Sequence, residues 1–448
     1  MDILSLFACF EPLVSPTTER HFSKIVQAVL TMSGKVTMLG ISRWTEKGGS
    51  YRTLQRFFAT ALPWTELFVK FFESHLFKSE REYILAGDET VVTKAGSQTF
   101  GIDRLFSGLS GKTVKGLGFF VLSVVAVGER KAYPLAVKQV VRSEAEKTQA
   151  RNRQKKRLKK SKQAKRSAKG RKPGSRNRDK NQLKFSAELM RINEMLKVLM
   201  KLIGRFIKVR YLAMDGHFGH HQAVLMAREC ELHLISKMRR DAALYEKYDG
   251  EYSGKGAKKK YGARLKYDIL SPKYLKKSWR EKEIITNYYQ GLFLHKEFGC
   301  QLNVVIIVKI NVKTRRVGHA ILFSNDTEMD CEKLVDYYSL RFQIEFNFRE
   351  AKQHFGLEDF MTTTKTGVEN AANLSFLMVN VSAKIIKESV GKCVGINDLK
   401  THYRGIKYAL ATLKMVVKKP EAILMNQIIE EVSRLGRIYQ TKSAISTA

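Results

Sequence analysis

The apolar run LGFFVLSVVAV, which starts at Leu117, constrains the fold of this chain more than any other segment. A membrane-spanning helix needs about 20 apolar residues, so a run of this length predicts a buried β-strand. The strand AYPLAVKQVV follows it after the turn residues GERK, which is the pattern of a hairpin. The chain is therefore expected to build a sheet and not to cross a membrane.

Strands and helices are mixed on both sides of this hairpin. The segments that follow a strand or helix pattern are, in order, EYILAGD, the hairpin, FSAELMRINEMLKVLMKLIG, FIKVRYLAM, residues 221–230, LHLISKM, VVIIVKI and HAILFSND. Helical patterns also cover residues 17–75 and the end of the chain from about Gly367, whereas residues 239–302 have no helical period. This order is typical of a mixed α/β layer protein.

Positive charge is the second feature that limits function. The chain of 448 residues has a formal net charge of +37, and a field of that sign attracts nucleic acid first and anionic membranes second. Residues 151–180 hold sixteen Lys or Arg and the single acid Asp179. They supply less than half of the charge, so the rest of the chain is basic too. A solvated, disordered loop is the alternative for this run.

The segment YYSLRFQIEFNFREAKQHFG, from Tyr337 to Gly356, contains a polar stripe. A helix turns about 100° per residue, which aligns Tyr338, Arg341, Glu345 and Lys352 beside an apolar face. The helix pattern alone leaves two interpretations open, a ladder of ion pairs and a functional site.

Two acids end apolar strands, Asp88 after YILAG and Asp215 after YLAM. If these strands are parallel neighbours, both carboxylates lie at one edge of the sheet, where Glu345 would complete a cluster. Oxygen ligands of this kind suit Mg²⁺, and two such ions support in-line phosphoryl transfer. Asp326, Glu89 and Glu350 are competing acids, because each lies near a strand end or near a favoured carboxylate.

Other metal ligands are poorly arranged. The five cysteines are scattered without a CxxC pair, and the histidines of DGHFGHHQ have no partner at ligand spacing elsewhere, so a zinc site is not predicted. A packing or DNA-contacting role is favoured for His217, His220 and His221.

Tyr338-x2-Arg341-x3-Glu345-x6-Lys352 resembles the Y-R-E-K motif of bacterial insertion-sequence transposases with a DDE triad, a cut-and-paste and often hairpin-forming class. The stretch DETVVTK is similar to that family's segment around its first catalytic aspartate, with Thr90 and Lys94 at the matching positions. The stretch MDGHFG is similar to the segment around the second. The resemblance spans residues 82–356.

The resemblance implies the roles of the site residues. Asp88, Asp215 and Glu345 would bind two Mg²⁺ ions, with Mn²⁺ as a substitute. Tyr338, Arg341, Lys352 and Lys94 would contact DNA near the cleaved bond. Trp279 in KKSWREK is a candidate to hold a flipped base, with a packing tryptophan as the alternative.

It also implies an RNase H-like core interrupted by a β-rich insertion domain. The expected regions are a helical DNA-binding region at 1–78, the first part of the core at 79–238 with a basic insertion at 143–182, the insertion domain at 239–320, the catalytic helix at 321–365 and a helical C-terminal region at 366–448. The expected protein binds element ends and target DNA as a homodimer at the bacterial nucleoid in the cytoplasm. An RNase H-like nuclease without strand joining and a non-catalytic basic nucleic-acid-binding protein remain the alternatives.

Overall fold

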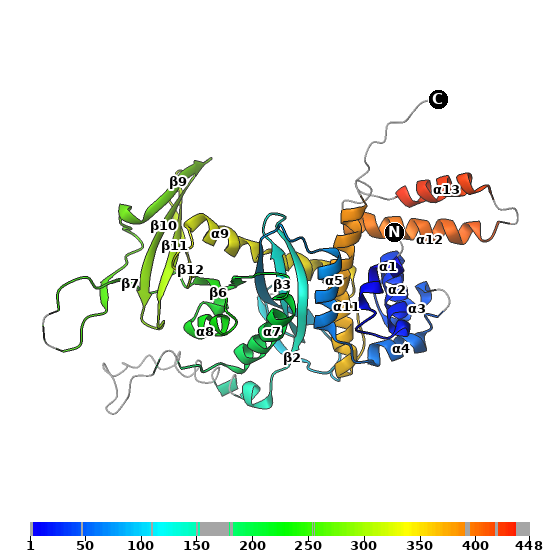
Figure 1. Cartoon of the computed structure of the whole chain (residues 1–448), viewed down its shortest axis with the longest axis horizontal. Coiled ribbons are helices and arrows are strands. Elements are labelled where there is room, and N and C mark those ends of the chain that lie inside the picture. The colour runs from blue at the N-terminus through cyan, green and yellow to red at the C-terminus, as the bar shows by residue number, and fades with distance from the viewer. Residues whose placement is uncertain are drawn as a thin grey trace, which may run out of the picture.

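The computed structural model describes residues 3–435 except 46–47, 109–110, 149–150, 153–178, 180–181, 253, 255, 390–394 and 417–419. Most of the basic run 151–180 therefore lies outside the described residues. A large mixed sheet runs through the described part and helices pack around it (Figure 1). The prediction of a mixed α/β architecture is confirmed.

Twelve strands make the sheet, and its main path has the order β2-β3-β1-β5-β6-β12-β11-β10-β7-β8, with β4 added on β3 and β9 on β10. β1 pairs antiparallel with β3 and parallel with β5, which is parallel to β6. The strands are β1 (Tyr83–Thr93), β2 (Asp103–Ser107), β3 (Lys112–Ala126), β4 (Lys131–Val140), β5 (Tyr211–Met214), β6 (His233–Met238), β7 (Leu244–Lys247), β8 (Tyr261–Arg264), β9 (Leu275–Glu281), β10 (Ile284–His295), β11 (Gln301–Asn311) and β12 (Val317–Ser324).

Helices come mainly before β1 and after β12. They are α1 (Ile3–Phe7), α2 (Pro16–Thr31), α3 (Met38–Trp44), α4 (Tyr51–Ala59), α5 (Trp64–His75), α7 (Ala187–Ile203), α8 (His221–Glu229), α9 (Cys331–Leu340), α10 (Gln343–His354), α11 (Lys365–Glu388), α12 (Ile396–Leu413) and α13 (Ala422–Arg434), with short 3₁₀ turns at Ala8–Phe10, Gly216–Phe218 and Pro272–Tyr274. None of the described helices combines the length and the apolar character that a membrane span requires.

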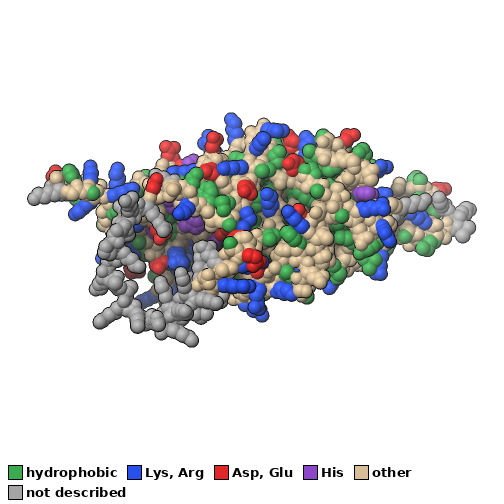
Figure 2. Space-filling view, turned by 90° about the horizontal axis from the view of Figure 1, so that it is seen from below, with side chains coloured by type: hydrophobic (Ala, Val, Ile, Leu, Met, Phe, Trp, Pro, Cys, Tyr) green, Lys and Arg blue, Asp and Glu red, His purple; other side chains and the backbone are tan. Residues whose placement is uncertain are grey.

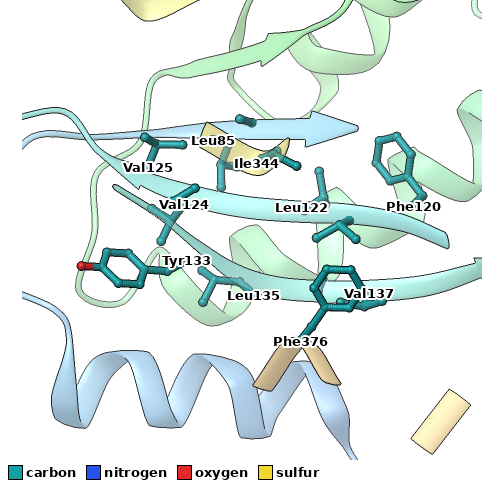
Figure 3. Close-up of a cluster of buried hydrophobic side chains, with 14 of the residues drawn as sticks. Leu85, Phe120, Leu122, Val124, Val125, Tyr133, Leu135, Val137, Ile344 and Phe376 are labelled. Atoms are coloured by element: carbon teal, nitrogen blue, oxygen red, sulfur yellow. The ribbon is translucent and has the colours of Figure 1, made fainter. Parts of the chain in front are cut away.

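The core lies where the helices cover the central strands. α5, α10 and α11 pack against β4, while α7 packs against β3 and α8 against β6. Figure 3 shows Ile344 of α10 beside Leu85 of β1, and Phe376 of α11 beside Val137 of β4. Ile344 and Phe376 are fully buried, so α10 is held on the sheet by its apolar face, as the helix pattern predicts.

A buried asparagine joins the N-terminal helices to α11. The Nε1 of Trp64 donates to Oδ1 of Asn370 at 2.7 Å, and Nδ2 of Asn370 donates to the carbonyls of Phe58 (2.8 Å) and Thr60 (2.7 Å). Because an unpaired buried amide is costly, these hydrogen bonds fix α4 and α5 against α11.

Two predicted boundaries are wrong. β1 does not end at Asp88 but continues to Thr93, because residues 88–93 remain paired with β3 after pairing with β5 has stopped at Gly87. The predicted single helix over 337–356 is two helices, since α9 ends at Leu340 and α10 begins at Gln343. Between them the N–H groups of Arg341 and Phe342 bond to carbonyls three residues back. This 3₁₀-type turn needs no Pro or Gly.

The fold predicts a large difference between two phenylalanines. Phe376→Ala removes a side chain that is 0% exposed and should lower the free energy of unfolding by about 3–5 kcal/mol. The control Phe106→Ala removes one that is 67% exposed and should change it by less than about 0.5 kcal/mol. Urea unfolding followed by circular dichroism measures both; similar losses in the two variants would contradict the described core.

Candidate active site

Asp88 on β1 and Asp215, the residue that follows the end of β5, lie at the same level. β1 and β5 are parallel, with Gly87 opposite Met214, so the residue after each of these two is one of the aspartates. The structure therefore meets the condition under which both carboxylates were expected at one edge of the sheet, that the two strands are parallel neighbours. Asp215 also begins the 3₁₀ turn Gly216–Phe218, where its Oδ1 accepts from the N–H of His217 at 3.1 Å.

The junction of α9 and α10 brings Arg341 to these acids. The Nη1 of Arg341 donates to Oδ2 of Asp88, and its Nη2 lies 3.7 Å from Oε1 of Glu345. Both partners of this contact are largely buried, since the side chains of Arg341 and Asp88 are 14% and 20% exposed. Glu345 is in the first turn of α10, where the helix dipole favours a carboxylate. The structure thus gathers Asp88, Asp215, Arg341 and Glu345.

Electrostatics link the three carboxylates. Burial raises the pKa of Asp88 to about 6; Arg341 and the N–H of Glu89 oppose the rise, and the charges of Asp215 and Glu345 add to it. The main cause of the raised pKa is therefore the burial of Asp88, and the neighbouring carboxylates Asp215 and Glu345 contribute less.

Tyr338 belongs to the same group. Its ring centroid lies 5.9 Å from the guanidinium carbon of Arg341. Burial raises the pKa of its phenol, Arg341 lowers it, and Asp215 and Asp88 raise it further. The predicted partners Tyr338 and Arg341 are therefore brought together with all three acids.

Lys94 and Lys352 form a second group farther along β1. Lys352 donates to the carbonyl of Val91 at 2.7 Å, and Lys94 donates to the carbonyls of Glu358 (2.9 Å) and Phe360 (2.7 Å). Burial lowers the pKa of Lys94 to about 8 and also lowers that of Lys352. These lysines join the end of β1 to the segment between α10 and α11.

Two of the competing acids, Asp326 and Glu350, lie elsewhere, whereas Glu89 follows Asp88 on β1 and its N–H donates to Oδ1 of Asp88 at 2.8 Å. Asp326 accepts a hydrogen bond from the hydroxyl of Tyr211 at 2.8 Å. Tyr211 is the first residue of β5, whereas Asp215 follows its last residue. Asp326 therefore lies at the end of β5 opposite to Asp215. Glu350 lies 3.8 Å from Lys131. Trp279 is on β9, far along the sheet from β1, and packs edge-on against Tyr288 with ring centroids 4.8 Å apart. The structure does not bring it to the acids.

One acidic residue beside the site escaped the sequence analysis. Glu188, in the first turn of α7, lies 3.1 Å from Nε2 of His217. This hydrogen bond raises the pKa of His217 and lowers that of Glu188. Burial raises the pKa of Glu89, and Glu188 adds to the rise. No spacing in the sequence links α7 to MDGHFG; only the packing does.

The donor set suits a hard divalent cation, because two aspartates and one glutamate offer only oxygen ligands. In the described part of the chain, however, no three His, Cys, Asp or Glu side chains are close enough together to hold a metal ion. Arg341 contacts Asp88 and faces Glu345, so a cation of the protein itself lies among the acids. The residues fit Mg²⁺ or Mn²⁺ in chemistry, provided that Arg341 moves.

Comparison with known families gives two matches. The model of the DDE superfamily endonuclease family matches residues 5–285, which is more than half of the chain and includes Asp88 and Asp215. The model of the transposase DDE domain matches residues 191–381, which include Asp215, Glu345 and the Y-R-E-K positions. Comparison with curated proteins gives no match.

The raised pKa of Asp88 predicts a pH-dependent stability. Between about pH 4 and 6 the folded protein keeps a proton that the unfolded chain has lost. Wild type should therefore lose stability relative to Asp88→Asn as the pH rises through this window, by about 1–3 kcal/mol. Melting temperatures measured in EDTA across pH 4–7 report the difference.

Asp326→Asn is the control for this measurement. Burial raises the pKa of Asp326, but hydrogen bonds from the N–H of Glu328 and the hydroxyl of Tyr211 outweigh it, so the pKa is lowered. Wild type should not lose stability relative to this variant as the pH rises. Parallel curves for wild type and Asp88→Asn would show that Asp88 titrates normally.

Proposed function

Because this chain belongs to the DDE superfamily endonucleases, we propose that it is the transposase of a bacterial insertion sequence of the Y-R-E-K class. It binds the terminal inverted repeats of its element, cleaves the DNA and joins the freed ends to target DNA by in-line transesterification. One observation carries this proposal: Asp88 on β1 is level with Asp215 just after the parallel strand β5, and the α9–α10 junction brings Arg341 to Asp88 and Glu345.

The strand order supports an RNase H-like core for this function. The path β4-β3-β1-β5-β6 has an antiparallel part, formed by β4, β3 and β1, followed by the parallel strands β5 and β6. Strands β7–β12 come between Asp215 and Glu345 in the chain and extend the same sheet. This agrees with an insertion domain at 239–320 between core segments 79–238 and 321–365, with the helical regions 1–78 and 366–448 outside.

Asp88, Asp215 and Glu345 would hold the two Mg²⁺ ions. Bound there, such ions make a water or a 3′-hydroxyl a better nucleophile and stabilise the leaving oxygen. The chain's own part is to hold the carboxylates at one edge of the sheet, on β1, after β5 and in the first turn of α10. Since the pKa of Asp88 is about 6, this carboxyl is mostly ionised at neutral pH.

Arg341 would bind a DNA phosphate in the active complex. Its planar guanidinium matches phosphate oxygens, and its Nε is buried without a hydrogen-bond partner among the described residues. A phosphate oxygen could accept from this Nε, and other phosphate oxygens would compete with Asp88 for the Nη donors of Arg341. Tyr338 would position the guanidinium through its ring, and Lys352 and Lys94 would contact phosphates only after giving up carbonyl partners.

The wider setting follows from charge and from the family. Lys and Arg side chains are scattered along the described part of the face seen in Figure 2, and with the net charge of +37 they favour a DNA partner. We propose that the protein acts as a homodimer on paired element ends at the bacterial nucleoid. Trp279 stays a candidate for stacking on a flipped base within that assembly.

The catalytic acids are tested by conservative substitutions. Asp88→Asn, Asp215→Asn and Glu345→Gln should each lower the rate of strand cleavage more than about 100-fold. Each removes a negative charge that would hold a metal ion, and such an ion stabilises the transition state by several kcal/mol. The substrate is duplex DNA carrying the sequences that flank the coding region, with Mg²⁺. Glu350→Gln, on the same helix but beside Lys131, should cleave like wild type.

The products distinguish the candidate functions. Joined strands support a transposase, and hydrolysis alone supports an RNase H-like nuclease. If wild type binds the duplex but never cuts it, the non-catalytic binding protein is favoured. Cleavage that survives any of the three substitutions would show that the site assignment is wrong.

Arg341 gives a test that needs no DNA. Arg341→Ala removes the cation nearest to Asp88 and Glu345, so the DNA-free protein should bind Mn²⁺ at least about ten-fold more tightly, measured by electron paramagnetic resonance. Arg341→Lys keeps the charge and should stay near wild type. Affinity that is unchanged or weaker in Arg341→Ala would show that the guanidinium does not compete with metal.

A further inference from the structure

The turn that follows β5 carries Asp215 and is short and rich in glycine. It begins at Asp215, continues as the 3₁₀ turn Gly216–Phe218 and ends at Gly219. Oδ1 of Asp215 accepts from the N–H of His217 at 3.1 Å, so one of the two carboxylate oxygens is engaged within the turn. Glycine has the greatest backbone freedom of all residues. A turn built in this way therefore needs contacts from outside to keep one shape.

Contacts from the sheet hold two points of this turn. Oγ of Ser236 on β6 donates to the carbonyl of Asp215 at 2.6 Å, and Ser236 is fully buried. Phe218 is also buried, and its ring packs edge-on against Phe120 of β3 with centroids 6.2 Å apart. These contacts fix the residues on both sides of His217, but they do not hold the side chain of His217 itself.

His217 is held from a different element. Its Nε2 lies 3.1 Å from Oε2 of Glu188, and since an ionised carboxylate can only accept, Nε2 is the donor. Glu188 is in the first turn of α7, where Oγ of Ser186 caps the helix by accepting from the N–H of Leu189 at 3.2 Å. The apolar face of α7 is buried. Glu188 thus joins a well-anchored helix to the residue whose N–H holds Oδ1 of Asp215.

The place of this contact indicates a role other than general stability. The side chains of His217 and Glu188 are 62% and 39% exposed, and exposed ion pairs add little to the stability of a fold. The pair nevertheless lies directly beside Asp215. Asp88 has a comparable neighbour in Arg341, which comes from the α9–α10 junction. Each of the two aspartates is therefore supported from outside the strand that precedes or carries it.

We propose that Glu188 is a positioning residue of the active site. By holding the imidazole of His217, it keeps the N–H of His217 on Oδ1 of Asp215 and fixes this carboxylate in the orientation that binds a divalent metal ion. Side chains that orient a metal ligand from behind change metal affinity by about 10–100-fold, because a ligand that is already ordered loses less freedom on binding. The inference rests on the proposed function, in which Asp215 is a metal ligand.

Mn²⁺ binding to the full chain without DNA tests this role by electron paramagnetic resonance. Glu188→Ala and His217→Ala should each weaken Mn²⁺ binding about ten-fold. Glu188→Gln keeps an oxygen that accepts from Nε2, so its affinity should stay within about three-fold of wild type. Glu194→Ala removes an exposed acid of the same helix and should also bind like wild type. An equal loss in Glu188→Gln, or no loss in Glu188→Ala, would overturn the proposal.

The double variant distinguishes positioning from direct attraction of the metal by charge. If Glu188 acts through His217, the variant that carries both alanines should bind Mn²⁺ no more weakly than either single variant. If the charge of Glu188 attracts the metal on its own, the two losses should add to about 100-fold. Additive losses would therefore overturn the proposal.

Hydrogen–deuterium exchange of the same variants needs no metal ion. Peptides that cover residues 215–219 should exchange faster in Glu188→Ala and His217→Ala than in wild type or Glu188→Gln, with the rest of the chain unchanged. Equal exchange in all variants would show that Glu188 does not hold the turn. If wild type itself does not bind Mn²⁺, the metal site of the proposed function is wrong, whereas the exchange data still decide whether Glu188 orders the turn.

Discussion

The contact of Arg341 with Asp88 is the interaction on which the site depends. Three acids at one edge of a sheet repel one another, and burial makes that repulsion stronger because the local dielectric is low. One guanidinium reduces it by touching Asp88 and facing Glu345, and it comes from the junction of the two helices that carry the motif. The apolar contacts of Ile344 hold α10 close enough for this to happen. Apolar packing places Glu345 near the two aspartates, and Arg341 reduces the repulsion among the three carboxylates.

Lys94 and Lys352 are also charged side chains that the fold holds by hydrogen bonds, partly away from solvent. Lys94 and Lys352 are half-buried beside backbone carbonyls and near Glu358, and burial lowers the pKa of each. Their hydrogen bonds fix the part of β1 beyond Asp88, which pairs with β3 alone. Lys352 therefore has a structural role in the DNA-free protein whatever it contacts in a complex, and its loss would disturb β1 as well as any phosphate contact.

The apolar pattern of the sequence predicted the helices and strands around the site, but not their boundaries or their contacts with one another. Apolar runs before Asp88 and Asp215 predicted two buried strands, and the condition that these strands are parallel neighbours is one that the structure meets. The extension of β1 to Thr93 depends on β3, a partner distant in sequence. The break at Arg341 has no Pro or Gly to mark it, and the pairing of Glu188 with His217 arises only when α7 packs beside the turn after Asp215. These features depend on strand pairing, on a local backbone turn and on side-chain packing, none of which the apolar pattern of the sequence records.

Charge balance connects DNA binding with metal binding in the proposed transposase. Three ionised carboxylates and one guanidinium carry a net negative charge, and part of the rise in the pKa of Asp88 comes from the other two carboxylates. Divalent cations at the carboxylates would repel Arg341, and a DNA phosphate would attract it. Each ligand therefore lowers the free energy needed to separate Arg341 from Asp88, and linkage requires that each then strengthens the binding of the other. In the proposed transposase, the site would therefore be inactive without DNA and would be completed by its substrate.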